Sequence, residues 1–344
     1  MDILITCKPD FEEILARESA LYHLSLQAKG QGWILARGND QALPRPGDVP
    51  LFDLCFACHI LENPAVITAT SVNSFTEKLA DLFIVHMGQT RIAGPWPFLF
   101  SSSGNERLIH RAKIVQECWL EKIQKKVSRV AKLSLEGMPC GPKFAEGNAF
   151  SQGQQRMQMD LQAPSRSFLK LEEAFRVFGC EPQKDDTVVD LGAAPGGWSY
   201  SALKRGAIVT AIDNGPLREP VKSHQKMHHL KTDALTYEHG RSKPVDWLLC
   251  DILEKPGIVL NLLHKWLSQK WCRRFIVNFK VGRSDPIVLL KEIRDTRKGL
   301  SLYSKRFVVR QLYHDREEIT LMGEAEENEA KVLRHKPKLE AGEN

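Results

Sequence analysis

Apolar residues in the first half of the chain recur with two different periods, and each period predicts a different kind of element. The opening run at residues 3–7 is short and rich in β-branched residues, and apolar side chains then return every three to four positions between Phe11 and Leu21. These patterns predict a strand followed by a helix. Further on, we expect a strand at residues 64–72, a helix at residues 73–87 that begins at Asn73 or Ser74, and a strand at residues 94–103.

The longest amphipathic pattern spans residues 108–130, where apolar side chains at three- and four-residue steps mark one face of a helix. The other faces of this predicted helix are basic. Such a face is more often solvated than functional, but it suits phosphate contacts on a chain with independent signs of an RNA substrate. The basic side chains are Arg107, Arg111, Lys113, Lys122, Lys125, Lys126, Arg129 and Lys132.

The second half of the chain has a different organisation. Residues 138–165 are rich in Gly, Gln, Pro and Asn and show little periodicity, which is typical of a linker. From Arg166 onward, buried strand patterns alternate with helical ones, which predicts a mostly parallel α/β sheet. After Gly323 the chain is dense in Glu and Lys, which favours disorder. We expect an N-terminal α/β region at residues 1–150, a linker at 151–165, an α/β domain at 166–322 and a disordered tail at 323–344.

Composition narrows the class of protein without identifying it. Hydrophobic residues make up 42% of the 344 residues and charged residues 26%, which is typical of globular chains and not of disordered ones. No apolar run approaches the roughly 20 residues of a membrane-spanning helix, and the N-terminus lacks the apolar core of a signal peptide. We therefore expect a cytoplasmic protein. The formal charge of +6 is compatible with a polyanionic partner but does not require one.

The eight cysteines are scattered through mostly apolar stretches, as expected of reduced and buried thiols. Cys55 and Cys58, followed by His59, have the spacing of half a metal site. No second pair with this spacing exists to complete tetrahedral coordination, so we interpret both cysteines as packing residues and expect no metal.

The most informative segment is TVVDLGAAPGGWS at residues 187–199. An apolar strand runs into a glycine-rich turn and then into a helix that begins near Trp198, so the backbone can approach a ligand closely at the carboxyl edge of a sheet. The turn differs from the GxGxxG dinucleotide fingerprint because Pro195 interrupts it. A helix N-terminus with close backbone approach suits a carboxylate as well as a phosphate.

Acidic residues follow the strands that come after this turn. Asp213 ends the next predicted strand, Asp233 ends a third and Asp251 ends a fourth. Aspartate is common at strand ends and helix caps, and for each residue alone that interpretation is as good as a functional one. Together they place several carboxylates at one sheet edge, where a carboxylate such as Asp213 can accept hydrogen bonds from the ribose of a nucleoside.

The run DLGAAPGGWS, preceded by SRSFLKLEEAF and followed by FIVNFK and YHDREEIT, resembles the FtsJ-like RNA ribose 2′-O-methyltransferases. The resemblance is dense over about residues 164–322 and weaker before them. It is strongest to the bacterial members that act on a cytidine of 23S rRNA and carry an N-terminal THUMP-type RNA-binding region. It implies a Rossmann-like domain that uses S-adenosylmethionine, with 23S rRNA or a large-subunit precursor as the partner.

The resemblance also implies the site. The Lys-Asp-Lys-Glu tetrad of the family matches Lys170, Asp251, Lys280 and Glu318, and Glu318 is preferred over its neighbour Glu317. We assign Lys280 as the base, because a ribose hydroxyl must lose its proton during attack and a nearby ammonium can lower the pKa of a lysine. The cofactor residues that the resemblance and the turn predict are Ser167, Gly192, Ala194, Pro195, Gly196, Gly197, Asp213, Asp233 and Asp251.

Two alternatives stay open at this point. The chain could be a non-catalytic RNA-binding or ribosome-assembly factor, although the complete tetrad argues against that class. It could also be an RNA base methyltransferase, which would use an NPPY-type motif or a nucleophilic cysteine. The fourth strand ends CDILEKP, and Cys250 should face away from Asp251 into the core. The segment after Lys280 lacks the basic run that the family predicts, which affects RNA contacts more than chemistry.

Overall fold

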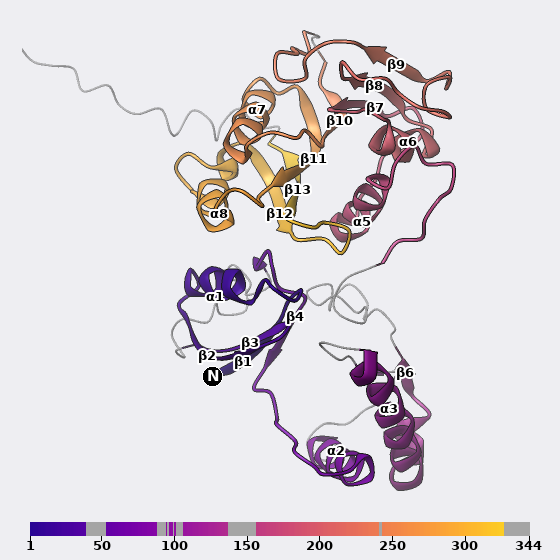
Figure 1. Ribbon diagram of the computed structural model, residues 1–344, viewed down its shortest axis with the longest axis vertical. Coiled ribbons are helices and arrows are strands. Elements are labelled where there is room, and N and C mark those ends of the chain that lie inside the picture. The colour runs from indigo at the N-terminus through magenta and orange to yellow at the C-terminus, as the bar shows by residue number, and fades with distance from the viewer. Residues whose placement is uncertain are drawn as a thin grey trace, which may run out of the picture. The chain divides into compact units, whose positions relative to one another are not determined.

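The computed structural model describes residues 1–38, 53–87, 94, 96–98, 100, 106–136, 156–240 and 243–326. The chain divides into two compact units, Met1–Gln155 and Arg156–Asn344, each of which is considered by itself (Figure 1). None of the helices within the described ranges has the length and hydropathy that a bilayer-spanning segment needs.

The N-terminal unit contains a four-stranded antiparallel sheet. The strands are β1 (Asp2–Thr6), β2 (Leu24–Gly30), β3 (Trp33–Gly38) and β4 (His59–Glu62), in the order β2-β3-β1-β4. Ile3 and Ile5 alternate with more exposed residues along β1 and pack in a core that includes Leu15 of α1 (Glu12–Ala20). Strand β1 and helix α1 confirm the two elements predicted for the start of the chain.

A second group of elements in this unit packs around aromatic side chains. It comprises α2 (Val72–Met87), β5 (Trp96–Phe98), α3 (Glu106–Lys126), α4 (Ser128–Ala131) and β6 (Ser134–Glu136). Trp119 of α3 is buried, and its ring lies 5.3–6.1 Å from those of Phe83, Trp96, Phe98 and Phe100. The rings of Phe83, Trp96, Phe98 and Phe100 thus pack against the apolar side of the predicted amphipathic helix.

Three expectations for this unit are wrong. Residues 64–71 form no strand, because Pro64 lacks an N–H and Val66 is 86% exposed, with no neighbouring layer to cover it. Helix α2 begins earlier than expected, since the hydroxyl of Ser71 accepts a hydrogen bond from the N–H of Ser74. The long basic helix ends at Lys126, because Val127 leaves helical geometry with φ −144° and ψ 57°.

The expected linker and tail fall mostly outside the described residues, namely at 137–155 and 327–344. Within residues 156–165 the chain forms turns without helix or strand. The tail was placed too early, because residues 323–325 continue the last strand, β13 (Glu318–Ala325).

The C-terminal unit is built on a seven-stranded mixed sheet with the order β12-β13-β11-β10-β7-β8-β9. Strands β10, β11, β7, β8 and β9 run parallel, whereas β13 pairs antiparallel with both β11 and β12. The other strands are β7 (Thr187–Leu191), β8 (Ile208–Ile212), β9 (Met227–Leu230), β10 (Val245–Cys250), β11 (Cys272–Lys280) and β12 (Ser304–Arg310).

Helices cover both faces of this sheet. Figure 1 shows α5 (Phe168–Phe178) and α6 (Gly197–Lys204) on one face, and α7 (Pro256–Ser268) and α8 (Pro286–Arg294) on the other. Strands buried on both faces read as continuous apolar runs, as the sequence shows for β7 and β10. The parallel α/β architecture that the sequence predicts is therefore present, with one antiparallel strand added inside the sheet.

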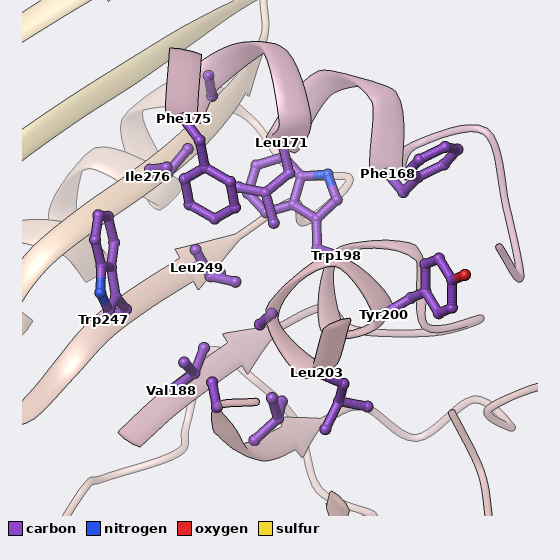
Figure 2. Packing of buried hydrophobic residues seen from close by; sticks show 14 of the residues in the cluster. Phe168, Leu171, Phe175, Val188, Trp198, Tyr200, Leu203, Trp247, Leu249 and Ile276 are labelled. Atoms are coloured by element: carbon purple, nitrogen blue, oxygen red, sulfur yellow. The ribbon is translucent and has the colours of Figure 1, made fainter. Parts of the chain in front are cut away.

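The core beneath α5 and α6 fixes the position of the first turn of α5. In Figure 2, Trp198 of α6 lies beside Leu171 of α5, in the same buried cluster as Phe175, Leu249 and Ile276. The indole N–H of Trp198 also donates a hydrogen bond of 3.0 Å to the carbonyl of Ser167. This packing holds the start of α5 against the glycine-rich turn.

Candidate active site

The site lies where the strand order reverses. From β7 the chain adds β8 and β9 on one side, whereas β10 and β11 lie on the other side. In open α/β sheets, this arrangement leaves a crevice at the carboxyl ends of the two central strands. Strand β7 leads there into the glycine-rich turn, and strand β10 leads into Asp251.

The turn needs glycine at defined positions. Gly192 and Gly196 have φ values of +76° and +114°, which side chains rarely adopt. A Cβ at Gly192 would also lie 2.9 Å from the side chain of Ile252, and one at Gly197 would overlap the hydroxyls of Ser165 and Ser167. The turn is therefore packed between the segment after β10 and the residues just before α5.

Asp213 fixes this turn from the neighbouring strand. Its two carboxylate oxygens accept hydrogen bonds from the N–H of Ala194 at 2.9 Å and from the N–H of Gly215 at 2.7 Å. The sequence predicted a ligand-binding role for Asp213, and it gave no sign of this structural one. Each carboxylate oxygen has a second lone pair, so the two roles are compatible.

Asp190, near the end of β7, is completely buried below the turn. One of its oxygens accepts a 2.6 Å hydrogen bond from the hydroxyl of Ser199, and the other has no hydrogen-bond partner within the described part of the chain. Burial, opposed by the Ser199 hydrogen bond and reinforced by the charges of Asp251 and Asp213, raises the pKa of Asp190 to about 7. Three carboxyl groups thus lie close together at this edge.

Two further predicted residues occupy different surroundings. Ser167 is the residue before α5, and its hydroxyl lies 2.7 Å from that of Ser165, beside the turn. Asp233 does not end a strand, because β9 stops at Leu230. Asp233 is exposed in the loop that follows, where its side chain accepts a hydrogen bond from the N–H of Leu235.

The pairing of β11 with β13 brings two members of the predicted tetrad together. In this antiparallel register Lys280 lies directly opposite Glu318, and their Nζ and Oε1 atoms are 3.5 Å apart. Lys280 also forms a short ion pair with Asp251, which follows β10. From the first turn of α5, Lys170 reaches Glu318 at 2.8 Å.

The four side chains form one charge cluster. Their exposed fractions are 12% for Lys170, 15% for Asp251, 17% for Glu318 and 20% for Lys280, so the cluster is mostly removed from water. Two ammonium groups and two carboxylates balance each other, as partly buried charges require.

The hydrogen bonds within the cluster set its protonation. Burial acts to lower the pKa of Lys170, but the charge of Asp251 and the hydrogen bond to Glu318 outweigh burial, so this pKa is raised. Burial acts to raise the pKa of Glu318, but the N–H of Arg316 and the two lysines outweigh it, so this pKa is lowered. The raised pKa of Lys170 favours its ammonium form.

A buried network lies behind Lys280. The amide oxygen of Asn278 accepts a 2.5 Å hydrogen bond from Lys280, and its amide nitrogen donates to Asp315 at 3.0 Å and to Thr320 at 3.1 Å. Because a lysine ammonium can only donate, this is the one amide orientation that satisfies all three partners. Asn278 and Asp251 thus accept two of the N–H bonds of Lys280 and fix its direction.

Three features of the site were not predicted from the sequence, namely Asn278, Asp315 and the burial of Asp190. A signal for Asn278 exists, since it is a polar residue inside the apolar run FIVNFK and lies two positions before Lys280, on the same face of the strand. Cys250 is buried, and burial raises the pKa of its thiol to about 12. Cys55 and Cys58 are buried in the N-terminal unit, and no cluster of three metal-ligating side chains occurs among the described residues.

The parallel-centred sheet, its switch point and the glycine-rich turn place the C-terminal unit among the Rossmann-like α/β folds. The sequence profile of the FtsJ-like methyltransferase family matches residues 163–343, more than half of the chain. The chain belongs to this family. The resemblance noted in the sequence is thereby confirmed.

Relatives with curated names agree with this assignment. The ribosomal RNA large subunit methyltransferase M of Pseudomonas syringae pv. syringae (strain B728a) is 42% identical over 174 residues, covering 48% of this chain and 48% of that protein. The protein of the same name from Azoarcus sp. (strain BH72) is 41% identical over 173 residues, covering 48% and 47%. The match thus spans about half the length of these relatives.

Among solved structures, the Methanococcus jannaschii fibrillarin pre-rRNA processing protein matches 42% of this chain and 67% of its own, with 15% sequence identity and a TM-score of 0.33. A likeness this low carries no argument about function.

Proposed function

We propose that this protein transfers a methyl group from S-adenosylmethionine to the 2′-hydroxyl of a ribose in RNA, and that its target is a cytidine of 23S rRNA or of a large-subunit precursor. The observation that carries the proposal is the cluster of Lys170, Asp251, Lys280 and Glu318 at the carboxyl edge of the sheet. The curated names of the relatives support the choice of ribosomal RNA.

The turn fits S-adenosylmethionine in two respects. A turn that admits no side chain at Gly192 or Gly197 allows close backbone approach at the N-terminus of α6, which suits the carboxylate of the cofactor. The neighbouring carboxyl groups of Asp190, Asp213 and Asp251 suit its cationic sulfonium and ammonium groups. Ser167, Gly192, the turn residues Ala194, Pro195, Gly196 and Gly197, and the acidic residues Asp213, Asp233 and Asp251 are the residues we assign to this site.

When bound, S-adenosylmethionine supplies a methyl group on a good leaving group. The chain must then bind the ribose, orient its hydroxyl and accept its proton. We assign proton removal to Lys280 as the general base. Asn278 and Asp251 accept two of its hydrogens, which leaves the remaining tetrahedral position of the amine for the hydroxyl. Lys170 stays charged and, with Glu318, keeps a positive charge next to the reacting oxygen.

The environment of Cys250 argues against an RNA base methyltransferase that uses a cysteine nucleophile. A nucleophilic cysteine must reach the thiolate form and be accessible, whereas the Cys250 thiol is buried and its pKa is raised. The complete charge cluster likewise argues against a non-catalytic assembly factor. We propose that the N-terminal unit, which would correspond to a THUMP-type region, contributes to RNA binding.

The proposed function is tested with the purified chain, tritiated S-adenosylmethionine and 23S rRNA transcribed without modifications. We expect tritium in the RNA, at a ribose that becomes resistant to alkaline cleavage on its 3′ side. Mapping of ribose methylation in cells with and without the gene then identifies the nucleotide. Label on a base would support the alternative enzyme class, and RNA binding without label would support the assembly factor.

A further inference from the structure

A pocket of about 510 Å³ lies in the C-terminal unit, outside the charge cluster and outside the glycine-rich turn. Its lining includes two arginines, Arg156 and Arg166, and two aromatic residues, Tyr313 and His314. Met157 and Leu169 line the same pocket.

The pocket borders the charge cluster through both of its walls. Leu169 immediately precedes Lys170 in α5, and Arg166 lies in the turn just before this helix. On the other wall, His314 immediately precedes Asp315 of the Asn278 network and is four residues from Glu318. The pocket and the charge cluster are therefore built on the same two segments of the chain, namely the start of α5 and the loop before β13.

The walls are fixed by hydrogen bonds to buried groups. The carboxylate of Glu173, which is 1% exposed, accepts hydrogen bonds from the N–H of Tyr313 at 2.8 Å and of His314 at 3.1 Å. His314 in turn accepts a 2.9 Å hydrogen bond from the N–H of Met157 through Nε2. The pocket is therefore a built feature that joins α5, the loop before β13 and the segment at residue 157.

No described residue neutralises the charge of the pocket. Arg156 and Arg166 are exposed, and within the described part of the chain neither forms an ion pair. Arg205 of the same unit behaves differently, since it pairs with both Glu172 and Glu181. Two unpaired guanidinium groups beside aromatic side chains match the chemistry of a nucleotide, because guanidinium groups bind phosphate and rings stack on a base.

We propose that this pocket binds a nucleotide of single-stranded RNA next to the methylated one, with its phosphate at Arg156 and Arg166 and its base against Tyr313 and His314. The inference rests on the proposed function for the identity of the neighbouring nucleotide, and it assigns the direction from which the RNA enters. Sequence-specific RNA recognition usually uses unstacked bases of this kind.

The test uses a fluorescein-labelled oligoribonucleotide of about eight nucleotides, a length within the usual range for single-strand sites. Its binding to the full chain is measured by anisotropy at several salt concentrations. We expect Arg156→Ala combined with Arg166→Ala to weaken binding at least about tenfold and to reduce the salt slope by about 0.7, the value for one lost phosphate contact on a single strand. Tyr313→Leu should weaken binding without changing the salt slope.

The control is Arg176→Ala, which removes one guanidinium group, as each of the two single substitutions does, from an exposed position at the other end of α5. It should bind the oligonucleotide like the unmodified chain. Thermal unfolding and S-adenosylmethionine binding should be unchanged in all variants, which separates a lost contact from a damaged fold. Equal RNA affinity of the double variant and the Arg176→Ala control would overturn the proposal.

Failure of this inference can be told apart from failure of the proposed function. If the unmodified chain transfers no methyl group to rRNA but binds the oligonucleotide through Arg156 and Arg166, the pocket stands and the reaction is wrong. If the chain methylates rRNA and the double variant does so with unchanged apparent affinity, the reaction stands and the pocket is wrong.

Discussion

Lysine–carboxylate pairs occur in both units of this protein, but their surroundings differ. In the N-terminal unit, Lys122 and Lys126 of α3 reach Glu77 of α2 at 2.8 and 2.6 Å, and the carboxylate is 45% exposed. In the C-terminal unit, the carboxylates of the charge cluster are 15% and 17% exposed, and a second buried layer supports them. Pairs of the same chemistry therefore serve different purposes.

The difference shows how function can be recognised. Exposed pairs gain little, because water and salt screen them, so they join two helices without indicating a site. A charge cluster with little access to water carries a desolvation penalty, which destabilises the fold. Such clusters therefore occur mainly where the charges have a function. In the basic helix, Lys122 and Lys126 contact acidic residues of their own unit.

The largest expected effect comes from the buried lysine. Lys280→Ala should fold and bind S-adenosylmethionine but lose about 10²–10⁴-fold in methyl transfer, the usual contribution of a general base. Lys126→Ala, the matched exposed pair, should leave the rate unchanged. Single-turnover transfer at saturating cofactor measures both, because slow product release then does not hide the chemical step. Near-normal turnover of Lys280→Ala would remove the tetrad assignment.

A second prediction concerns stability against pH. The folded-state pKa of Asp190 is about 7, above its unfolded value of about 3.9, so the folded protein binds an extra proton between these values. Its contribution to the free energy of unfolding therefore falls as pH rises from about 4 to 7. Asp190→Asn should remove this fall and stabilise the free protein at pH 8 by up to about 4 kcal/mol, which urea unfolding at both pH values measures.

The cofactor provides the counterpart of that experiment. Calorimetry should show weaker S-adenosylmethionine binding by Asp190→Asn, because the substitution removes a negative charge below the turn that we assign to the cationic ligand. Equal stability profiles for the two proteins would contradict the raised pKa, and equal cofactor affinity would contradict the assigned surroundings of the ligand.

Asp213→Ala tests the turn. It removes both the predicted ribose contact and the hydrogen bonds to Ala194 and Gly215, so cofactor binding should weaken by ~1.5–3 kcal/mol, the range for a charge-assisted hydrogen bond. Calorimetry on the folded variant measures the loss. Asp233→Ala, at the exposed acidic position, should weaken cofactor binding less than Asp213→Ala does. A larger loss for Asp233→Ala would show that we place the ribose at the wrong aspartate.

A fourth variant tests the buried network of Asn278, Asp315 and Thr320 behind Lys280. Asn278→Ala should lower the single-turnover rate by about 10- to 100-fold without changing cofactor affinity, because Lys280 loses one of the acceptors that orient it. Thr320→Val removes only one of the two acceptors of the Asn278 amide and should cost less. If Asn278 served packing alone, its substitution would reduce stability but would leave the methyl-transfer rate of the folded protein unchanged.

The smallest effect is expected at the exposed pairs. Glu77→Gln keeps the shape of the side chain and removes its charge, so the thermal midpoint should barely move at physiological salt. A clear loss of stability that depends on salt would mean that the α2–α3 pairs matter more than their exposure indicates, and the contrast between the two units would weaken.

The strands of the C-terminal unit could be predicted because each strand carries its own signal in a short stretch of sequence, namely an apolar run that is often followed by an acidic residue. The preference for Glu318 over Glu317 also agrees with the geometry, since the register of β11 and β13 places Glu318 opposite Lys280. The false strand at residues 64–72 shows the limit, because β-branched residues form a strand only where another strand and a covering layer are available. Asp190 and Asp315 were missed because burial depends on contacts between distant segments.

Strand β13 has a consequence for how the protein becomes active during synthesis. It supplies Glu318 and Thr320 and lies between β11 and β12, although it is the last strand described along the chain. Lys170 and Glu318 are 148 residues apart, so almost the whole unit must be translated before they can meet. Until then β11 keeps an unpaired edge and Lys280 lacks its opposite partner. The site is therefore incomplete in the nascent chain until β13 is inserted between β11 and β12, and this one pairing event joins the sheet and completes the charge cluster.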